Sequence, residues 1–178
     1  MEKLLARIST WIARAERTIC CTLTVALVVL ILLNVATRAF DIALFWVDEL
    51  AVYVMIWMAL IGGSLILHER GHVTVQLLTE AVTPRFRRYL LLLSDTLVLV
   101  FVTGLLMMTW VWFDLAGFSH YGFDMDAFAA ETYNFIYQEP TNTLGIKKFW
   151  VWLVVPIVSV TMTLHAMARL ARDWMESE

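Results

Sequence analysis

Proline, glycine and charged residues are all scarce in this sequence. Its 178 residues include 3 prolines and 7 glycines, and only 16% of the residues are charged. Because proline and glycine interrupt helices, their scarcity favours long helices. A soluble domain is about 25% charged and about 45–50% apolar, whereas 61% of these residues are apolar. The composition therefore excludes an ordinary soluble domain and a disordered chain.

Cysteine and an excess of positive charge are also lacking. The 2 cysteines, Cys20 and Cys21, are adjacent within an apolar run, so we expect no disulfide framework. The 13 Lys and Arg residues against 16 Asp and Glu give a net charge of −3, which provides no basic field for a nucleic acid. The sequence has no zinc-ligand spacing, glycine-rich phosphate loop or nucleophile constellation. We therefore expect no catalytic residue and no metal site, in a protein that is not an enzyme.

Four apolar segments are long enough to cross a bilayer. The hydrocarbon core is about 30 Å thick, so a helix needs about 20 apolar residues to span it. The runs are continuous and do not alternate in polarity, which favours helices over a β-barrel. The sequence thus predicts an all-α membrane protein, a single membrane domain over residues 1–178 with four transmembrane helices. The predicted spans are residues 18–37, 50–67, 89–113 and 149–168.

Lysine and arginine gather in the N-terminal segment, in the 68–88 connection and in the C-terminal tail. By the positive-inside rule these parts lie on the cytoplasmic side, so we expect both termini there. In residues 1–17 apolar side chains recur at helical spacing with basic residues between them, which predicts an amphipathic helix in the inner interface. The alternative is that this segment is only the polar start of the first span.

The connection at 114–148 is long for a loop without secondary structure, and it is rich in acidic and aromatic residues. On the orientation above it is periplasmic. Met125, Phe128 and Ala129 fall on one helical face, which predicts a short helix at about 125–138 that stops before Pro140. Either the loop caps the outer face of the helix bundle or it presents a docking surface to a partner, and the sequence leaves both open.

Ionisable side chains inside predicted spans are energetically costly and therefore mark candidate sites. Asp95 lies in the third predicted span, where it is either part of a proton or cation relay or a structural contact to a neighbouring helix. His68 and His165 fall at similar depth near the inner ends of two spans, and His72 follows His68 by about one helical turn. This placement supports an alternative function, a haem-b-binding four-helix membrane anchor of a redox enzyme.

A specific pattern covers the joint between the first two predicted helices. The elements of the pattern are Asn34-x-x-x-Arg38-x-Phe40, Trp46-Val47-Asp48-Glu49-Leu50, Gly62 and Arg70-Gly71-His72-Val73. In order and spacing the pattern resembles the small membrane subunit (Q subunit) of tripartite ATP-independent periplasmic (TRAP) transporters, the DctQ-like family. The likeness covers residues 20–80 best, and the Lys-Lys-Phe-Trp stretch before Pro156 is also similar.

The resemblance implies a secondary transporter of the bacterial inner membrane that imports an organic anion, a carboxylate or a sulfonate, together with Na+. A large membrane subunit (M type) would carry the Na+ and substrate sites and move as an elevator. A periplasmic substrate-binding protein (P type) would deliver the substrate. This chain would be a non-catalytic scaffold in the lipid bilayer, without a cofactor of its own, and would help to dock the binding protein.

The residues that carry the resemblance are also candidates for contact with these partners. Arg38 and Glu49 bracket the outer turn, where they either pair with each other or contact another subunit. Small residues such as Gly62 and Gly63 allow helices to approach closely inside a membrane. The candidate interface residues are Arg38, Trp46, Glu49, Gly62, Gly63, His72 and Asp95.

Overall fold

The computed structural model describes residues 2–69 and 83–175, and most of these residues are helical. Within these two ranges the only extended pairing is a single bridge between Pro140 and Lys147. The predicted site residue His72 lies outside the described residues. The helices are α1 (Glu2–Ala39), α2 (Phe45–Glu69), α4 (Pro84–Phe113), α5 (Leu115–His120), α6 (Met125–Thr132), α7 (Lys148–Trp152) and α8 (Val154–Met175).

Four helical segments are long and apolar enough to cross a membrane, which confirms the predicted all-α class with four spans. They are Leu4–Ala39, Phe45–Glu69, Phe86–His120 and Lys148–Trp174. The predicted interfacial segment and the first predicted span form one continuous helix, α1. How the first half of α1 lies relative to a bilayer stays a prediction.

The fourth predicted span is divided into α7 and α8 at Leu153. Pro156 explains the break, because its ring nitrogen has no proton to donate to the carbonyl of Trp152 one turn earlier.

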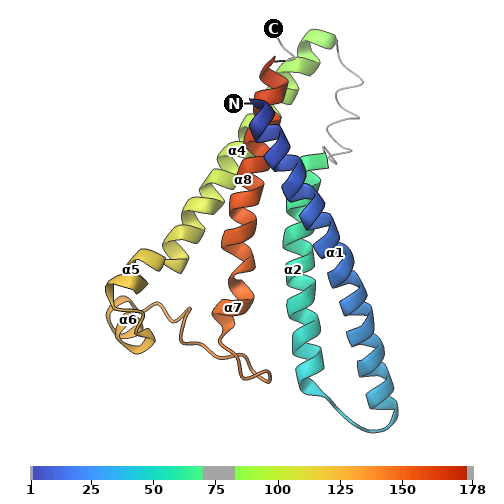
Figure 1. Cartoon of the computed structure of the whole chain (residues 1–178), viewed down its shortest axis with the longest axis vertical. Helices are drawn as coiled ribbons and strands as arrows, with labels where there is room; N and C mark the ends of the chain where they lie inside the picture. Colours follow the sequence, from blue (N-terminus) through green and yellow to red (C-terminus); the bar gives the residue numbers. More distant parts are fainter. Residues whose placement is uncertain (1, 70–82, 176–178) are drawn as a thin grey trace.

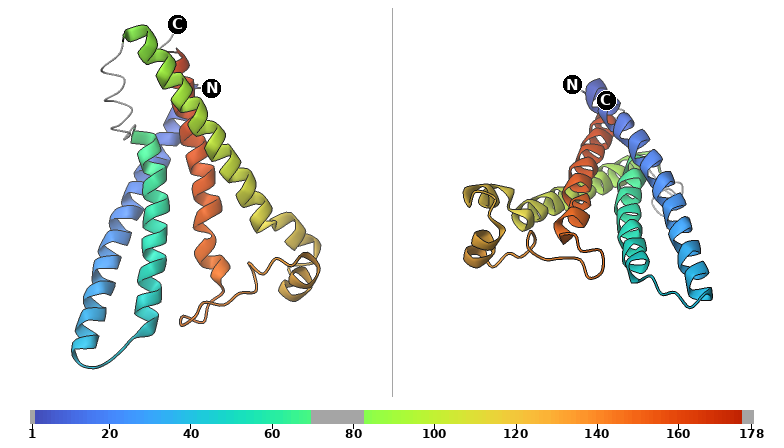
Figure 2. Two further views of the ribbon diagram at one scale, coloured as in Figure 1. Left: turned by 180° about the vertical axis from the view of Figure 1, so that it is seen from behind. Right: turned by 60° about the horizontal axis from the view of Figure 1, so that its bottom comes forward.

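The four long helices converge at one end of the molecule and diverge toward the other (Figure 1). The start of α1 and the end of α8 lie at the converging end, and both further views show the same spread (Figure 2). α1 and α2 form a hairpin, while α8 packs against α1, α2 and α4. α8 is therefore the central helix, and α4 leans away from it toward α5 and α6 (Figure 1).

The long connection at 114–148 has a hydrophobic core of its own. The rings of Phe118 and Tyr137 stack with centroids 3.9 Å apart, and Phe128 is fully buried beside them. The Tyr137 hydroxyl donates to the carbonyl of Phe113 at the end of α4, and burial raises the pKa of this phenol. Phe149 of α7 packs on the same cluster. The connection thus caps the diverging ends of α4 and α8, the first of the two roles that the sequence left open.

The predicted helix at 125–138 is too long, because α6 ends at Thr132. Tyr133 has a φ of 55°, in the left-handed region that ends a helix. The side chain of Asn134 then accepts a bond from the amide of Ile136 at 3.1 Å and donates to the carbonyl of Trp112 at 2.8 Å. The local bond to Ile136 and the long-range bond to Trp112 compete with helical bonds and stop the helix well before Pro140.

Candidate functional site

A buried polar cluster joins α1, α2 and α8 at the converging end of the helices. His165 on α8 is 1% exposed and lies between two side chains of α1. Its Nδ1 is 2.7 Å from the Ser9 hydroxyl, and its Nε2 is 3.2 Å from a carboxylate oxygen of Glu16. Ser9 also lies 2.9 Å from Nδ1 of His68 on α2. One turn before His165, the Thr161 hydroxyl is 2.9 Å from that of Ser64 on α2.

A second buried contact joins α8 to α4. Arg169 on α8 forms an ion pair with Asp95 at 2.5 Å, and the two residues are 5% and 1% exposed. Asp173, one turn further along α8, is also buried. Asp95 is therefore a structural contact between two helices, one of the two roles predicted for it.

Most residues of the buried polar cluster and of the contact between Arg169 and Asp95 were not predicted from the sequence. Ser9 and Glu16 fall within the segment that was predicted to be interfacial, yet they are only 3% and 5% exposed. Arg169 belongs to the basic residues of the C-terminal tail, which the positive-inside rule places on the cytoplasmic side. A signal was present, because His165, Arg169 and Asp173 follow one another at intervals of one helical turn and so share a face of α8.

His68 and His165 are predicted to lie at similar depth, and the structure places their ring centroids 5.1 Å apart. Both Nδ1 atoms face the same hydroxyl, that of Ser9, and Nε2 of His165 faces Glu16. An axial haem ligand needs a ring nitrogen directed at the iron. Both ring nitrogens of His165 are directed at protein partners, which fits a role in helix packing.

At the diverging end, the Glu49 carboxylate on α2 holds the loop that precedes α7. It accepts bonds from the amides of Asn142, Thr143 and Leu144 at 2.8, 2.6 and 3.1 Å. The hydroxyls of Thr143 and Tyr53 donate to the same carboxylate at 2.5 and 2.7 Å. A carboxylate that accepts five hydrogen bonds holds the loop firmly, because hydrogen bonds to a charged acceptor are stronger than those between neutral groups.

The expected pair of Arg38 and Glu49 does not form. Arg38 instead bonds to Asp48 at 2.7 Å and to the side-chain oxygen of Asn34 at 2.8 Å. Asn34 in turn donates to Asp48, which closes a three-residue network across the α1–α2 turn. The reason is helical geometry: successive residues of α2 point about 100° apart, so Asp48 faces α1 while Glu49 faces the loop. Trp46 is 41% exposed beside this turn.

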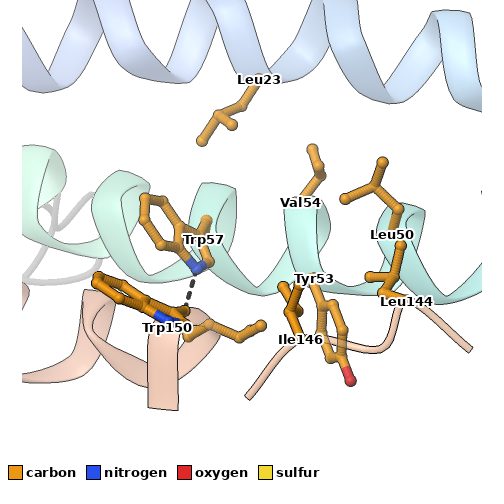
Figure 3. Close-up of a pocket in the computed structure, with 9 residues that line it drawn as sticks. Leu23, Leu50, Tyr53, Val54, Trp57, Leu144, Ile146 and Trp150 are labelled. Carbon is orange, nitrogen blue, oxygen red and sulfur yellow. Dashed lines mark hydrogen bonds between the residues drawn. The ribbon is translucent and has the colours of Figure 1, made fainter. Parts of the chain in front are cut away.

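An apolar pocket of about 260 Å³ lies where the α1–α2 hairpin meets the loop and α7 (Figure 3). The Trp57 indole donates to the carbonyl of Val151 at 2.7 Å and so ties α2 to α7. None of the described residues that line the pocket is cationic. Its lining residues are Leu23, Leu50, Tyr53, Val54, Trp57, Leu144, Ile146, Trp150 and Val151.

The two adjacent glycines of α2 have different surroundings. A Cβ at Gly63 would lie 3.3 Å from Cε of Met162, so this glycine allows α8 to approach closely. A Cβ at Gly62 would meet nothing within 4 Å. Gly62 shares its helical face with Met55 and Ile66, which are 49% and 48% exposed. Within the residues that the structure describes, the face of α2 around Gly62 is therefore uncovered.

Together these features define a helical membrane protein with four candidate spans, in which the polar side chains of the described part serve mainly to join its own helices. Residues 27–176 match the family of tripartite ATP-independent periplasmic transporters, DctQ component, and the chain belongs to this family. It is also similar to a candidate TRAP transporter small permease protein of Haemophilus influenzae, with 25% identity over 113 residues. This match covers 63% of the chain and 70% of the relative. The family is a component of a transport system and not an enzyme.

Proposed function

We propose that this chain is the non-catalytic small permease subunit of a Na+-coupled TRAP transporter that imports an organic anion, a carboxylate or a sulfonate. The observation that carries the proposal is the family match over residues 27–176. In this proposal both termini lie in the cytoplasm of a bacterial cell, and the chain sits in the inner membrane. The Na+ and substrate sites belong to the large subunit.

The role proposed for this chain is that of a fixed frame for the large subunit. An elevator-type carrier domain needs a part of the complex that does not move with it. The ion pair of Arg169 and Asp95 and the cluster around His165 support a frame that is rigid at the converging end. The loop held by Glu49 supports rigidity at the other end. The contacts at the converging end cross between helices, so relative motion of these helices would break buried polar bonds.

The uncovered face of α2 around Gly62 is the candidate contact surface for the large subunit. A glycine with open space above it allows a neighbouring helix to approach closely in a membrane. At the outer end, α5, α6 and the loop up to α7 form the surface proposed to help dock the periplasmic binding protein. Phe123 and Tyr133 are 61% and 80% exposed on this part.

The test is an affinity purification of the tagged chain from its native membrane in mild detergent, followed by mass spectrometry. A much larger multi-span permease should accompany it in roughly equal amount. Deleting the chain should abolish Na+-dependent uptake of the organic anion, and re-expression should restore it. A redox enzyme in place of the permease, in a coloured preparation, would overturn the proposal in favour of the haem-binding alternative.

A further inference from the structure

The face of α1 that points away from the other helices carries two arginines on either side of a tryptophan. Arg7, Trp11 and Arg14 follow one another at helical spacing, and Trp11 is 73% exposed. Ser9 and Glu16 lie on the opposite face, where they are 3% and 5% exposed against α2 and α8. Within the described residues, packing against α2 and α8 explains the face with Ser9 and Glu16. It does not explain the face with Arg7, Trp11 and Arg14.

Within the described residues neither guanidinium group on this face forms an ion pair or a hydrogen bond, although the backbone carbonyl of Arg14 accepts from the Thr18 hydroxyl at 3.0 Å. Arg17, by contrast, is paired with Glu69 of α2. The Thr10 hydroxyl is also used, because it donates to the carbonyl of Ala6 at 2.8 Å. A hollow of about 420 Å³ lies over the face, lined by Ala6, Arg7, Thr10, Trp11 and Arg14.

The same face continues into the apolar part of α1. Val25, Val29 and Leu32 share its direction and are 65%, 56% and 63% exposed. With a rise of about 1.5 Å per residue, Arg14 lies about 6 Å before the apolar run that begins at residue 18. That distance corresponds to the headgroup layer of a bilayer, where tryptophan is enriched and long arginine side chains extend toward lipid phosphates. Arg14 thus lies at headgroup depth, Arg7 about 10 Å further along the helix axis from the apolar run, and the aliphatic side chains at acyl-chain depth.

We propose that the Arg7–Trp11–Arg14 face binds the phosphate of an anionic phospholipid in the inner leaflet, with the acyl chains along the apolar face of α1. A guanidinium group matches phosphate in charge and geometry, and two of them span the hollow. A charged surface followed along α1 by an aliphatic surface fits a lipid better than it fits a soluble peptide or free phosphate. The assignment to the inner leaflet depends on the proposed function, through the orientation proposed there.

The test uses the full chain, purified in detergent and titrated with dioleoylphosphatidylglycerol or dioleoylphosphatidylcholine, with bound lipid counted by native mass spectrometry. Arg7→Gln and Arg14→Gln should each lower phosphatidylglycerol binding about fivefold, the factor typical of one cationic side chain at an anionic surface. The matched control is Arg17→Gln, which removes the same charge from the same helix. It should leave binding within about twofold of the unmodified chain, because its guanidinium already pairs with Glu69.

Three results would overturn the proposal. The first is that the unmodified chain shows no preference for phosphatidylglycerol over phosphatidylcholine. The second is that Arg17→Gln loses as much binding as the other two variants. The third is that Arg7→Gln and Arg14→Gln keep the lipid and lose the large subunit, which would make this face a protein contact. Because the lipid titration requires no permease, its failure is distinguishable from a failure of the proposed transport function.

Discussion

Asp95 of α4 and Arg169 of α8 form an ion pair at 2.5 Å in which both residues are nearly inaccessible to solvent. α4 leans away from α8 toward its outer end (Figure 1), so this pair fixes the two helices where they are close together. An ion pair of this kind is costly to form, and it is much more costly to leave one partner unpaired.

Asp95→Ala should strongly destabilise the protein, because Arg169 would keep a buried charge without its partner. The expected loss is about 3–5 kcal/mol in the free energy of unfolding. Denaturant or thermal unfolding in detergent measures it. Glu69→Ala is the matched control, since it breaks the exposed pair with Arg17 and should cost less than about 1 kcal/mol. Equal losses in the two variants would contradict the structural role of the Asp95 contact.

Glu49→Gln should release the loop before α7 while leaving the helices intact. The substitution preserves side-chain size but removes the charge that accepts three amides and two hydroxyls. Hydrogen exchange at residues 142–144 should accelerate roughly tenfold or more. Asp48→Asn is the control, because Asp48 contacts the α1–α2 turn and has no recorded bond to this loop. Unchanged exchange in Glu49→Gln would show that the carboxylate does not hold the loop.

Arg38→Ala should reduce uptake by the complex although the chain still inserts and folds. The pair with Asp48 is exposed, so its loss should cost no more than about 1 kcal/mol of stability. A transport defect beyond that cost would indicate a contact with another subunit. Uptake is measured in cells, with membrane levels of the chain determined in parallel. Normal uptake by both Arg38→Ala and Glu49→Gln would remove the proposed role of these residues.

Gly62→Leu and Gly63→Leu should separate the surface for the large subunit from the internal packing. Gly63→Leu should destabilise the isolated chain, because its Cβ would already press on Met162 of α8. Gly62→Leu should leave the isolated chain stable, since nothing lies within 4 Å of its Cβ position, and should weaken copurification of the large subunit. If Gly62→Leu retains the large subunit in full amount, the α2 face is not the contact surface.

His165→Ala should loosen the junction of α1, α2 and α8. Ser9 and Glu16 would lose their hydrogen bonds to His165, and His68 would lose its ring contact with it. Each buried polar group left unsatisfied costs about 1–3 kcal/mol. Unfolding in detergent measures the loss. Absorption spectroscopy of the unmodified chain, purified from its native membrane, should show no Soret band. A Soret band that disappears in His165→Ala would instead support haem ligation.

The spans and the family resemblance could be predicted from the sequence because they depend on local properties. A run of apolar residues of sufficient length is a helix candidate wherever it packs, and the spacing from Asn34 to Gly62 is visible without coordinates. The overestimated helix at 125–138 shows the limit of this approach. Asn134 ends that helix through a bond to Trp112, a residue far away in the chain.

The partners of the polar residues depended on tertiary structure. Asp95 was recognisable as a costly charge, but its pairing with Arg169 follows from how α4 and α8 are rotated against each other. Similarly, Arg38 pairs with Asp48 rather than Glu49 because of the directions in which these two side chains point from α2. Composition and periodicity describe each helix separately, whereas a pair between helices depends on their relative rotation and depth, which arise only when distant segments pack together.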